Sequence, residues 1–193
     1  MKKVIIVHGW DGSPKEGMHS WMKKELEKKG FEVMAPKMPS PAKPQIETWI
    51  PFLQKTIKGL DKDTYFIGHS IGCQGVLRYL ETQDKEIGGI VLIAPWMHLD
   101  LNTIAEEGEE SVKIAKPWME IPINWVKINK LTKKCVCIFS NNDPYVPLEE
   151  KEIFMAKLNA KIIVEKNKGH FTEDDGVREN KTAVEALLAF VKK

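Results

Sequence analysis

The sequence predicts a single α/β domain over residues 1–193, in which helices flank a parallel sheet of about six strands. Short β-branched runs alternate with longer amphipathic stretches, which is the pattern of βαβ units. A length of 193 residues is enough for one well-buried core and short for two. The alternation lapses at 96–130, a longer excursion that contains three tryptophans and that we expect to form a small flap.

Six short apolar runs are the expected strands. They are VIIV at 4–7, FEVMA at 31–35, TYFIG at 64–68, GGIVLIA at 88–94, CVCIF at 135–139 and KIIVE at 161–165. The order of runs and amphipathic stretches favours parallel pairing, because each crossover then has room for a helix.

Helices are expected between these runs. The residues Ser13-Pro14-Lys15-Glu16 have the order of a helix start, with a cap, a proline at the first helical position and a capping-box glutamate. This first helix should end near Gly30. The other expected helices run from near Thr48 past Ile57, from Ser70 onward, over 148–158 and over 178–192. The proline-rich stretch at 36–44 is an expected loop.

Charge, hydropathy and cysteine usage exclude several classes of protein. Lys and Arg number 29 against 27 Asp and Glu, and the two signs are interspersed, so we expect no nucleic-acid partner. The apolar runs are too short for a membrane span or a signal peptide, so no membrane partner is expected. Three cysteines, two of them two residues apart in one run, indicate buried reduced thiols and a cytoplasmic location. No second pair of cysteines or histidines has the spacing of metal ligands, so we expect neither a metal site nor a cofactor.

Two glycine-rich loops are expected to meet at one crevice. In an open parallel sheet, ligands bind beyond the carboxyl ends of the strands, where the strand order reverses. If the first strand neighbours both the second and the third, HGWDG at 8–12 and GHSIG at 68–72 face each other there.

GHSIG fits the G-x-S-x-G pattern of a nucleophile elbow, which requires a strand before it and a helix after it. The turn is so tight that side chains at the flanking positions would collide with the neighbouring strand and helix, and Gly68 and Gly72 avoid this. Ser70 is then either a nucleophile above a helix N-terminus or a simple helix cap.

A serine nucleophile needs a base, and the base needs an orienting acid. His170 comes just past the sixth run and is the expected base, and Asp143 comes just past the fifth and is the expected acid. The backbone N–H groups of Trp10 and Ile71 are the expected oxyanion hole.

The remaining histidines have other expected roles. His8 and His69 should order their loops through hydrogen bonds, and His19 and His98 should lie at the surface or at the rim of the pocket.

The other aspartates are weaker candidates for the acid. Asp61 and Asp63 precede a strand, so they should lie at the opposite end of the sheet. Asp100 is on the excursion after the fourth run and is a distant second choice. Asp174 and Asp175 follow the expected base and should lie on the surface or cap the last helix, although contact with the base stays open.

Six segments, VIIVHGW, FIGHSIGC, VLIAPW, PWMEIPINWVKI, CVCIFSNNDPYVP and KGHF, occur in this order and span almost the entire chain. In these segments the chain resembles the small serine hydrolases typified by retinoblastoma-binding protein 9 and its YdeN-like bacterial relatives. The resemblance implies a compact α/β-hydrolase without a large lid, with Ser70 as nucleophile, Asp143 as acid and His170 as base. The acidic start of 101–116 departs from the family and could be a mobile flap.

These residues predict hydrolysis of a small carboxylic ester through an acyl-enzyme. We expect Met38, Trp96, Met97 and Trp118 to line the substrate pocket and to suit small uncharged acyl groups. The same triad would also serve an amide or peptide hydrolase, and a protein-binding member of the fold without catalysis is the alternative from another class. A protein partner and a monomeric or dimeric state both stay open.

Overall fold

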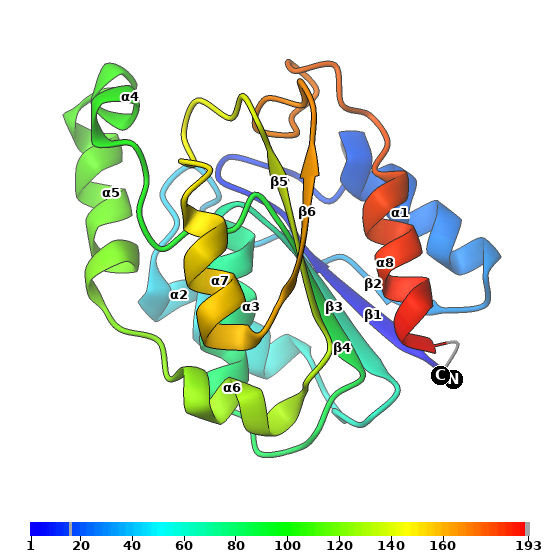
Figure 1. The fold of residues 1–193 in the computed structure, drawn as a ribbon. Coiled ribbons are helices and arrows are strands. Elements are labelled where there is room, and N and C mark those ends of the chain that lie inside the picture. Colours follow the sequence, from blue (N-terminus) through cyan, green and yellow to red (C-terminus); the bar gives the residue numbers. More distant parts are fainter. Residues whose placement is uncertain (16, 192–193) are drawn as a thin grey trace.

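A six-stranded parallel sheet runs through the centre of the molecule in the order β2-β1-β3-β4-β5-β6 (Figure 1). The structure, a computed structural model, describes residues 1–15 and 17–191. Its strands are β1 (Lys3–Val7), β2 (Glu32–Met34), β3 (Thr64–His69), β4 (Gly89–Ile93), β5 (Cys135–Ser140) and β6 (Lys161–Glu165). Every neighbouring pair is parallel, which confirms the predicted sheet of six strands.

The strand order reverses beside β1, as the expected crevice requires. In the register, Val4 of β1 lies opposite Val33 of β2 on one side and Tyr65 of β3 on the other. Strands β3, β4 and β5 are buried along their whole length, whereas β6 at the sheet edge is partly exposed. Burial on both faces explains why the central strands read as continuous apolar runs.

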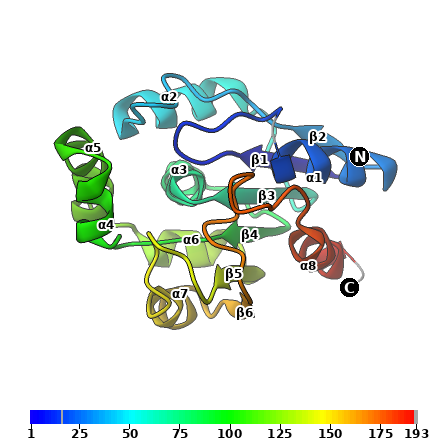
Figure 2. The same ribbon diagram turned by 90° about the horizontal axis from the view of Figure 1, so that it is seen from above.

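Helices cover both faces of this sheet in the described part of the chain. They are α1 (Gly17–Lys28), α2 (Ile46–Thr56), α3 (Ile71–Glu81), α4 (Leu101–Glu106), α5 (Glu109–Glu120), α6 (Trp125–Leu131), α7 (Glu150–Leu158) and α8 (Lys181–Val191). Seen from above, α1 and α8 lie on one face, and α2, α3, α6 and α7 lie on the other (Figure 2). Among the described residues, no helix combines the length and the apolar character needed to cross a membrane.

The first helix begins later than predicted. Residues 10–11 and 14–15 form turns, and α1 starts at Gly17. The Ser13 hydroxyl accepts the N–H of Lys15 at 3.2 Å, which is a local turn rather than a cap, because serine side chains also stabilise turns. The expected capping-box residue, Glu16, lies outside the described residues.

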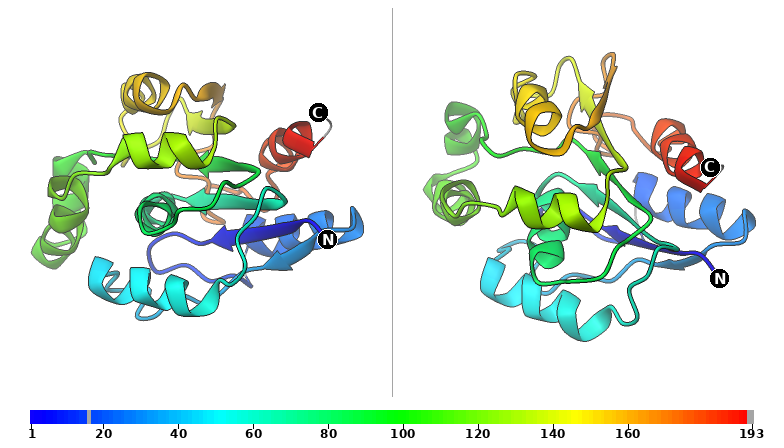
Figure 3. Two further views of the ribbon diagram at one scale, coloured as in Figure 1. Left: turned by 90° about the horizontal axis from the view of Figure 1, so that it is seen from below. Right: turned by 60° about the horizontal axis from the view of Figure 1, so that its bottom comes forward.

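The excursion at 96–130 contains α4, α5 and α6, and the first two stand apart from the other helices in every view (Figures 1–3). Its attachment is at the end of α5, where the Trp118 ring packs against Trp49 at 5.8 Å between centroids. The Trp118 indole donates to the Pro44 carbonyl at 3.1 Å, and the Arg78 guanidinium donates to the Trp118 carbonyl at 3.0 Å. The base of this segment is therefore fixed to the body of the protein.

Candidate active site

Ser70 occupies the turn between β3 and α3 with a positive φ of 52° and a ψ of −125°, a backbone conformation that residues other than glycine rarely adopt. The Ser70 N–H donates to Ile93 O of β4 at 2.9 Å, and its carbonyl accepts the N–H of Cys73 at 2.8 Å, so both sides of the turn are tied down. Its side chain makes no capping hydrogen bond to α3. The helix-cap role therefore does not apply, and the strained φ is typical of functional turns.

The two glycines of the elbow sit where a side chain has no room. A Cβ atom at Gly68 would lie 2.7 Å from the Cys73 Cα atom. A Cβ atom at Gly72 would lie 2.4 Å from the Val7 carbonyl oxygen and 2.5 Å from that of His8. These contacts are with backbone, which cannot rotate away, so α3 approaches β1 closely only because position 72 is glycine.

We expect Gly72→Ala to lower the free energy of unfolding by about 1–3 kcal/mol or more, because the methyl group would push α3 away from β1. Gly75→Ala is the matched control on the same helix, since its Cβ atom would approach the Trp49 ring at 3.4 Å, an ordinary contact. Urea denaturation of both variants measures the difference. Equal stability of the two variants would show that the close approach does not constrain residue 72.

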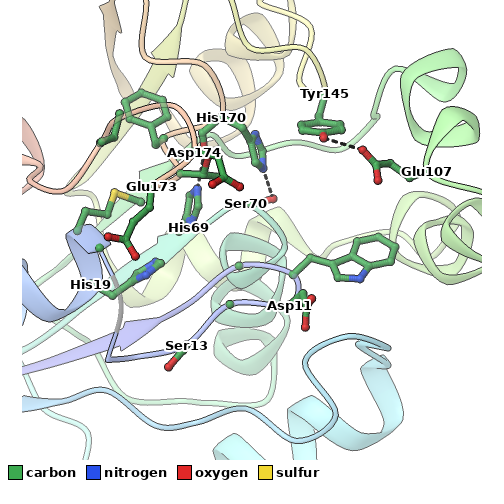
Figure 4. Close-up of a pocket in the computed structure, with 18 of the residues that line it drawn as sticks. Asp11, Ser13, His19, His69, Ser70, Glu107, Tyr145, His170, Glu173 and Asp174 are labelled. Carbon is green, nitrogen blue, oxygen red and sulfur yellow. Dashed lines mark hydrogen bonds between the residues drawn. The ribbon is translucent and has the colours of Figure 1, made fainter.

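The structure brings together the three side chains that the sequence selected. His170 Nε2 lies 2.8 Å from Ser70 Oγ, and His170 Nδ1 lies 2.8 Å from Asp143 Oδ2 (Figure 4 shows the Ser70 contact). The side chains of Asp143 and His170 are only 2% and 13% exposed. A carboxylate can only accept, so with neutral imidazole Nδ1–H donates to Asp143 and Nε2 is free to accept the Ser70 hydroxyl proton.

Asp143 is itself held in place by the loop that follows β5. Its Oδ1 atom accepts the backbone N–H of Tyr145 at 2.9 Å and that of Val146 at 3.1 Å, which leaves Oδ2 to face His170. The competing candidate Asp100 instead caps α4, where it accepts the Thr103 N–H at 2.9 Å. Both oxygens of Asp143 therefore have fixed acceptor roles.

The loop that carries His170 is fastened by residues that sequence reasoning did not assign to the site. Asp175 Oδ2 accepts the His170 N–H at 2.8 Å and the Thr172 hydroxyl at 2.7 Å, so the contact left open for Asp175 is made through the backbone. Asn142 Oδ1 accepts the Gly169 N–H at 3.0 Å. In the sequence, the only indication of this role for Asn142 was its position directly before the expected acid.

His69 links the elbow to the same loop. Its Nε2–H donates to the His170 carbonyl oxygen at 2.8 Å, which fixes its tautomer because a carbonyl only accepts. His8 donates from Nδ1 to the Gly9 carbonyl and accepts the Met38 N–H, so both histidines order their loops as predicted. Burial, and then repulsion from the rings of His19 and His170, hold the pKa of His69 well below its usual value.

This pKa shift predicts a loss of stability in mild acid. The unfolded chain binds a proton at His69 as pH falls below about 6.5, whereas the folded protein does not. Proton binding therefore stabilises the unfolded state and lowers the free energy of unfolding. We expect a slope of up to about 1.4 kcal/mol per pH unit from this residue until its folded pKa is reached. Comparing denaturation of wild type and His69→Gln between neutral and mildly acidic pH isolates the contribution, and identical pH slopes would refute it.

The expected oxyanion donors, the backbone N–H groups of Ile71 and Trp10, come from the start of α3 and from the loop after β1. Ile71 is the first residue of α3, and the first N–H groups of a helix have no intrahelical acceptor. Trp10 lines the same cavity as Ser70, and within residues 1–15 and 17–191 its backbone N–H has no acceptor. Their role in binding an oxyanion stays a prediction.

A cavity of about 600 Å³ opens above Ser70, lined by loops from the carboxyl ends of the strands. His19 lines it as well, while His98 is exposed and contacts Glu150 at 2.9 Å. Tyr145 and Glu107 also line the cavity, although nothing in the sequence placed them there.

The predicted pocket lining needs correction. Met38, Trp96, Met97 and Trp118 do not line this cavity, and they are 1%, 1%, 8% and 0% exposed within the core. Large apolar side chains gain most from full burial, so tryptophan and methionine near a site are more often core residues than lining residues.

Comparison with known proteins finds similar chains that match over nearly the whole length of this one. A family model described as serine hydrolase matches residues 4–189. The putative hydrolase YdeN of Bacillus subtilis is 26% identical over 194 residues, covering 100% of this chain and 97% of the relative. The serine hydrolase RBBP9 of Rattus norvegicus is 29% identical over 173 residues, covering 88% of this chain and 87% of the relative.

Solved structures share the fold. The crystal structure of the ydeN gene product from B. subtilis matches with a TM-score of 0.87 at 26% identity, covering 100% of both chains. Est1E from Butyrivibrio proteoclasticus matches with a TM-score of 0.70 at 16% identity, covering 100% of this chain and 89% of that chain. The second likeness concerns the fold alone.

Proposed function

Because this chain belongs to the serine hydrolase family, we propose that it cleaves a small carboxylic ester through an acyl-enzyme, with Ser70, His170 and Asp143 as its triad. The observation that carries the proposal is the continuous pair of 2.8 Å hydrogen bonds from Ser70 Oγ through the imidazole to the Asp143 carboxylate. A serine hydroxyl becomes a useful nucleophile at neutral pH only when such a base can take its proton.

In the first half of the reaction, Ser70 Oγ attacks the carbonyl carbon while His170 Nε2 takes the hydroxyl proton. The carbonyl π electrons move onto oxygen, and the N–H groups of Ile71 and Trp10 stabilise that oxyanion by about 2.7–4 kcal/mol per donor. When the intermediate collapses, the bond to the alcohol oxygen breaks and His170 Nε2–H protonates the leaving alcohol. The acyl group is then an ester of Ser70.

In the second half, water replaces the alcohol. His170 Nε2 takes a proton from the water as its oxygen attacks the acyl carbon, and a second oxyanion forms at the same donors. Its collapse breaks the bond to Ser70 Oγ, which regains a proton from His170, and the carboxylic acid leaves. Asp143 stays ionised throughout and stabilises the imidazolium.

The ester assignment is tested by comparing para-nitrophenyl esters of short acids with the matching para-nitroanilides. We expect the esters to be turned over with the higher kcat/KM. Anilide turnover at an equal or greater kcat/KM would replace the ester assignment by an amide or peptide hydrolase. Absence of turnover of both by folded protein would favour the alternative of a binding protein without catalysis.

We also propose that the protein is cytoplasmic. Cys73, Cys135 and Cys137 are free and buried, and burial raises the pKa of Cys73 and Cys137. Unpaired thiols of this kind are typical of a reducing compartment.

A further inference from the structure

The charged side chains that line the cavity are predominantly acidic. Asp11, Glu107, Glu173 and Asp174 all line it, and neither lysine nor arginine does among the described residues. Glu173 and Asp174 lie on one side of Ser70, and Glu107 lies on the other (Figure 4). A cavity of this charge disfavours carboxylate substrates and attracts cations.

The two sides differ in how far their charge is compensated. Glu173 lies 3.5 Å from the guanidinium of Arg178, whereas Glu107 forms no ion pair within the described chain. Its Oε1 atom accepts the Tyr145 hydroxyl at 2.9 Å, and its Oε2 atom has no partner among the described residues. Burial and the hydrogen bond to Glu107 raise the pKa of Tyr145, so the phenol keeps its proton and is the donor in this hydrogen bond.

Tyr145 fixes this charge at a short distance from the triad. The Tyr145 ring lies 5.1 Å from the His170 ring between centroids, and its hydroxyl reaches Glu107 at the far end (Figure 4). Tyr145 therefore contacts the imidazole with its ring and the carboxylate with its hydroxyl. The buried Leu99 and Ile104 also line the cavity, and they belong to the same stretch of chain as Glu107, so the cavity offers an aromatic ring, apolar side chains and a carboxylate oxygen.

We propose that the substrate carries a cationic group, a quaternary or primary ammonium a few bonds from the scissile carbonyl, which binds beside Tyr145 and Glu107. This inference rests on the proposed function, since it names the charge of the ester that is cleaved. A carboxylate next to an aromatic ring combines Coulombic and cation–π attraction. It also gives the acidic start of 101–116 a role, and it differs from the expectation of an uncharged acyl group.

The test compares isosteric ester pairs. One pair is the para-nitrophenyl ester of trimethylammonio-butanoic acid and its neutral isostere, in which a tert-butyl group replaces the trimethylammonium group. The second pair carries the same two groups on the leaving side of a butanoyl thioester. We expect kcat/KM to be about five- to twentyfold higher for the charged member of one pair at low salt, and this ratio should decline as salt is added.

Glu107→Gln keeps an oxygen for the Tyr145 hydroxyl but removes the charge, so the ratio of charged to neutral ester should fall to about twofold or less. Glu109→Gln is the matched control, because Glu109 is exposed like Glu107 and carries the same charge two residues away, but it does not line the cavity. A ratio that falls equally in both variants, or wild-type ratios near one for both pairs, would overturn the inference.

Binding to the Ser70→Ala variant separates this inference from the proposed function, because it needs no turnover. If the variant binds the charged ester several-fold tighter than the isostere while wild type cleaves neither, the cation site stands and the hydrolase function does not. If wild type cleaves the neutral esters without any charge preference and the variant binds both members equally, the hydrolase function stands and the cation site does not.

Discussion

Replacing Ser70 by alanine is expected to lower ester turnover by about 10⁴–10⁶-fold without unfolding the protein. The substitution removes only the hydroxyl group that is hydrogen-bonded to His170. Without this hydroxyl no acyl-enzyme can form. The backbone of the turn is held by hydrogen bonds to Ile93 and Cys73, which the substitution leaves in place. The measurement is kcat/KM for a short para-nitrophenyl ester, with circular dichroism to show that the fold is kept.

Ser13→Ala provides the matched control for this prediction. Ser13 also lines the cavity, but its hydroxyl accepts the backbone N–H of Lys15 and forms no hydrogen bond with a histidine among the described residues. We expect its turnover to stay within about tenfold of wild type, since surface substitutions of this kind have small effects. If the Ser70 variant retained turnover comparable with this control, Ser70 would not be the nucleophile.

Asp143→Asn is expected to lower kcat by about 10³–10⁴-fold, because it should reverse the tautomer of His170. The loop offers two N–H donors, from Tyr145 and Val146, to one side of residue 143, so an asparagine would place its oxygen there. Its NH₂ group would then face His170 Nδ1, which would have to accept instead of donate. Nε2 would carry the proton and could no longer take one from Ser70.

The competing aspartate supplies the control for the acid. Asp100→Asn keeps an oxygen that can cap α4, so its kcat should change by less than about tenfold. Both variants are compared with wild type in kcat and in denaturant midpoint. A larger loss of kcat from Asp100→Asn than from Asp143→Asn would identify Asp100, in the excursion after β4, as the acid of the triad.

The strands and the order of the triad were readable from the sequence because each depends on local chemistry. The buried strands are continuous apolar runs. Parallel pairing of these strands brings residues 70, 143 and 170 to the same sheet edge, independently of which side chains they carry. The elbow glycines were readable for the same reason, since a tight strand-to-helix turn demands them locally. The backbone contacts at Gly72 bear this out.

The lining of the cavity was not readable, because it depends on how distant loops fold over the sheet. Tyr145 and Glu107 meet through one hydrogen bond between the β5 loop and the end of α4, and no spacing in the sequence signals that contact. Trp96 and Trp118 belong to the stretch that was expected to border the site, yet both are buried in the core. Burial of a large indole ring stabilises the fold more than exposure in a pocket would. The start of α1 was misplaced because Ser13 stabilises a turn.

The central claim, that Ser70 is activated by His170 and Asp143, is tested most directly by intact-mass spectrometry after incubation with a fluorophosphonate. We expect one covalent adduct on wild type and none on Ser70→Ala, because only a serine with a working base displaces fluoride from phosphorus at a useful rate. A folded wild-type protein that remains unmodified, or an adduct that persists in the Ser70→Ala variant, would contradict the assignment of Ser70 as the activated nucleophile.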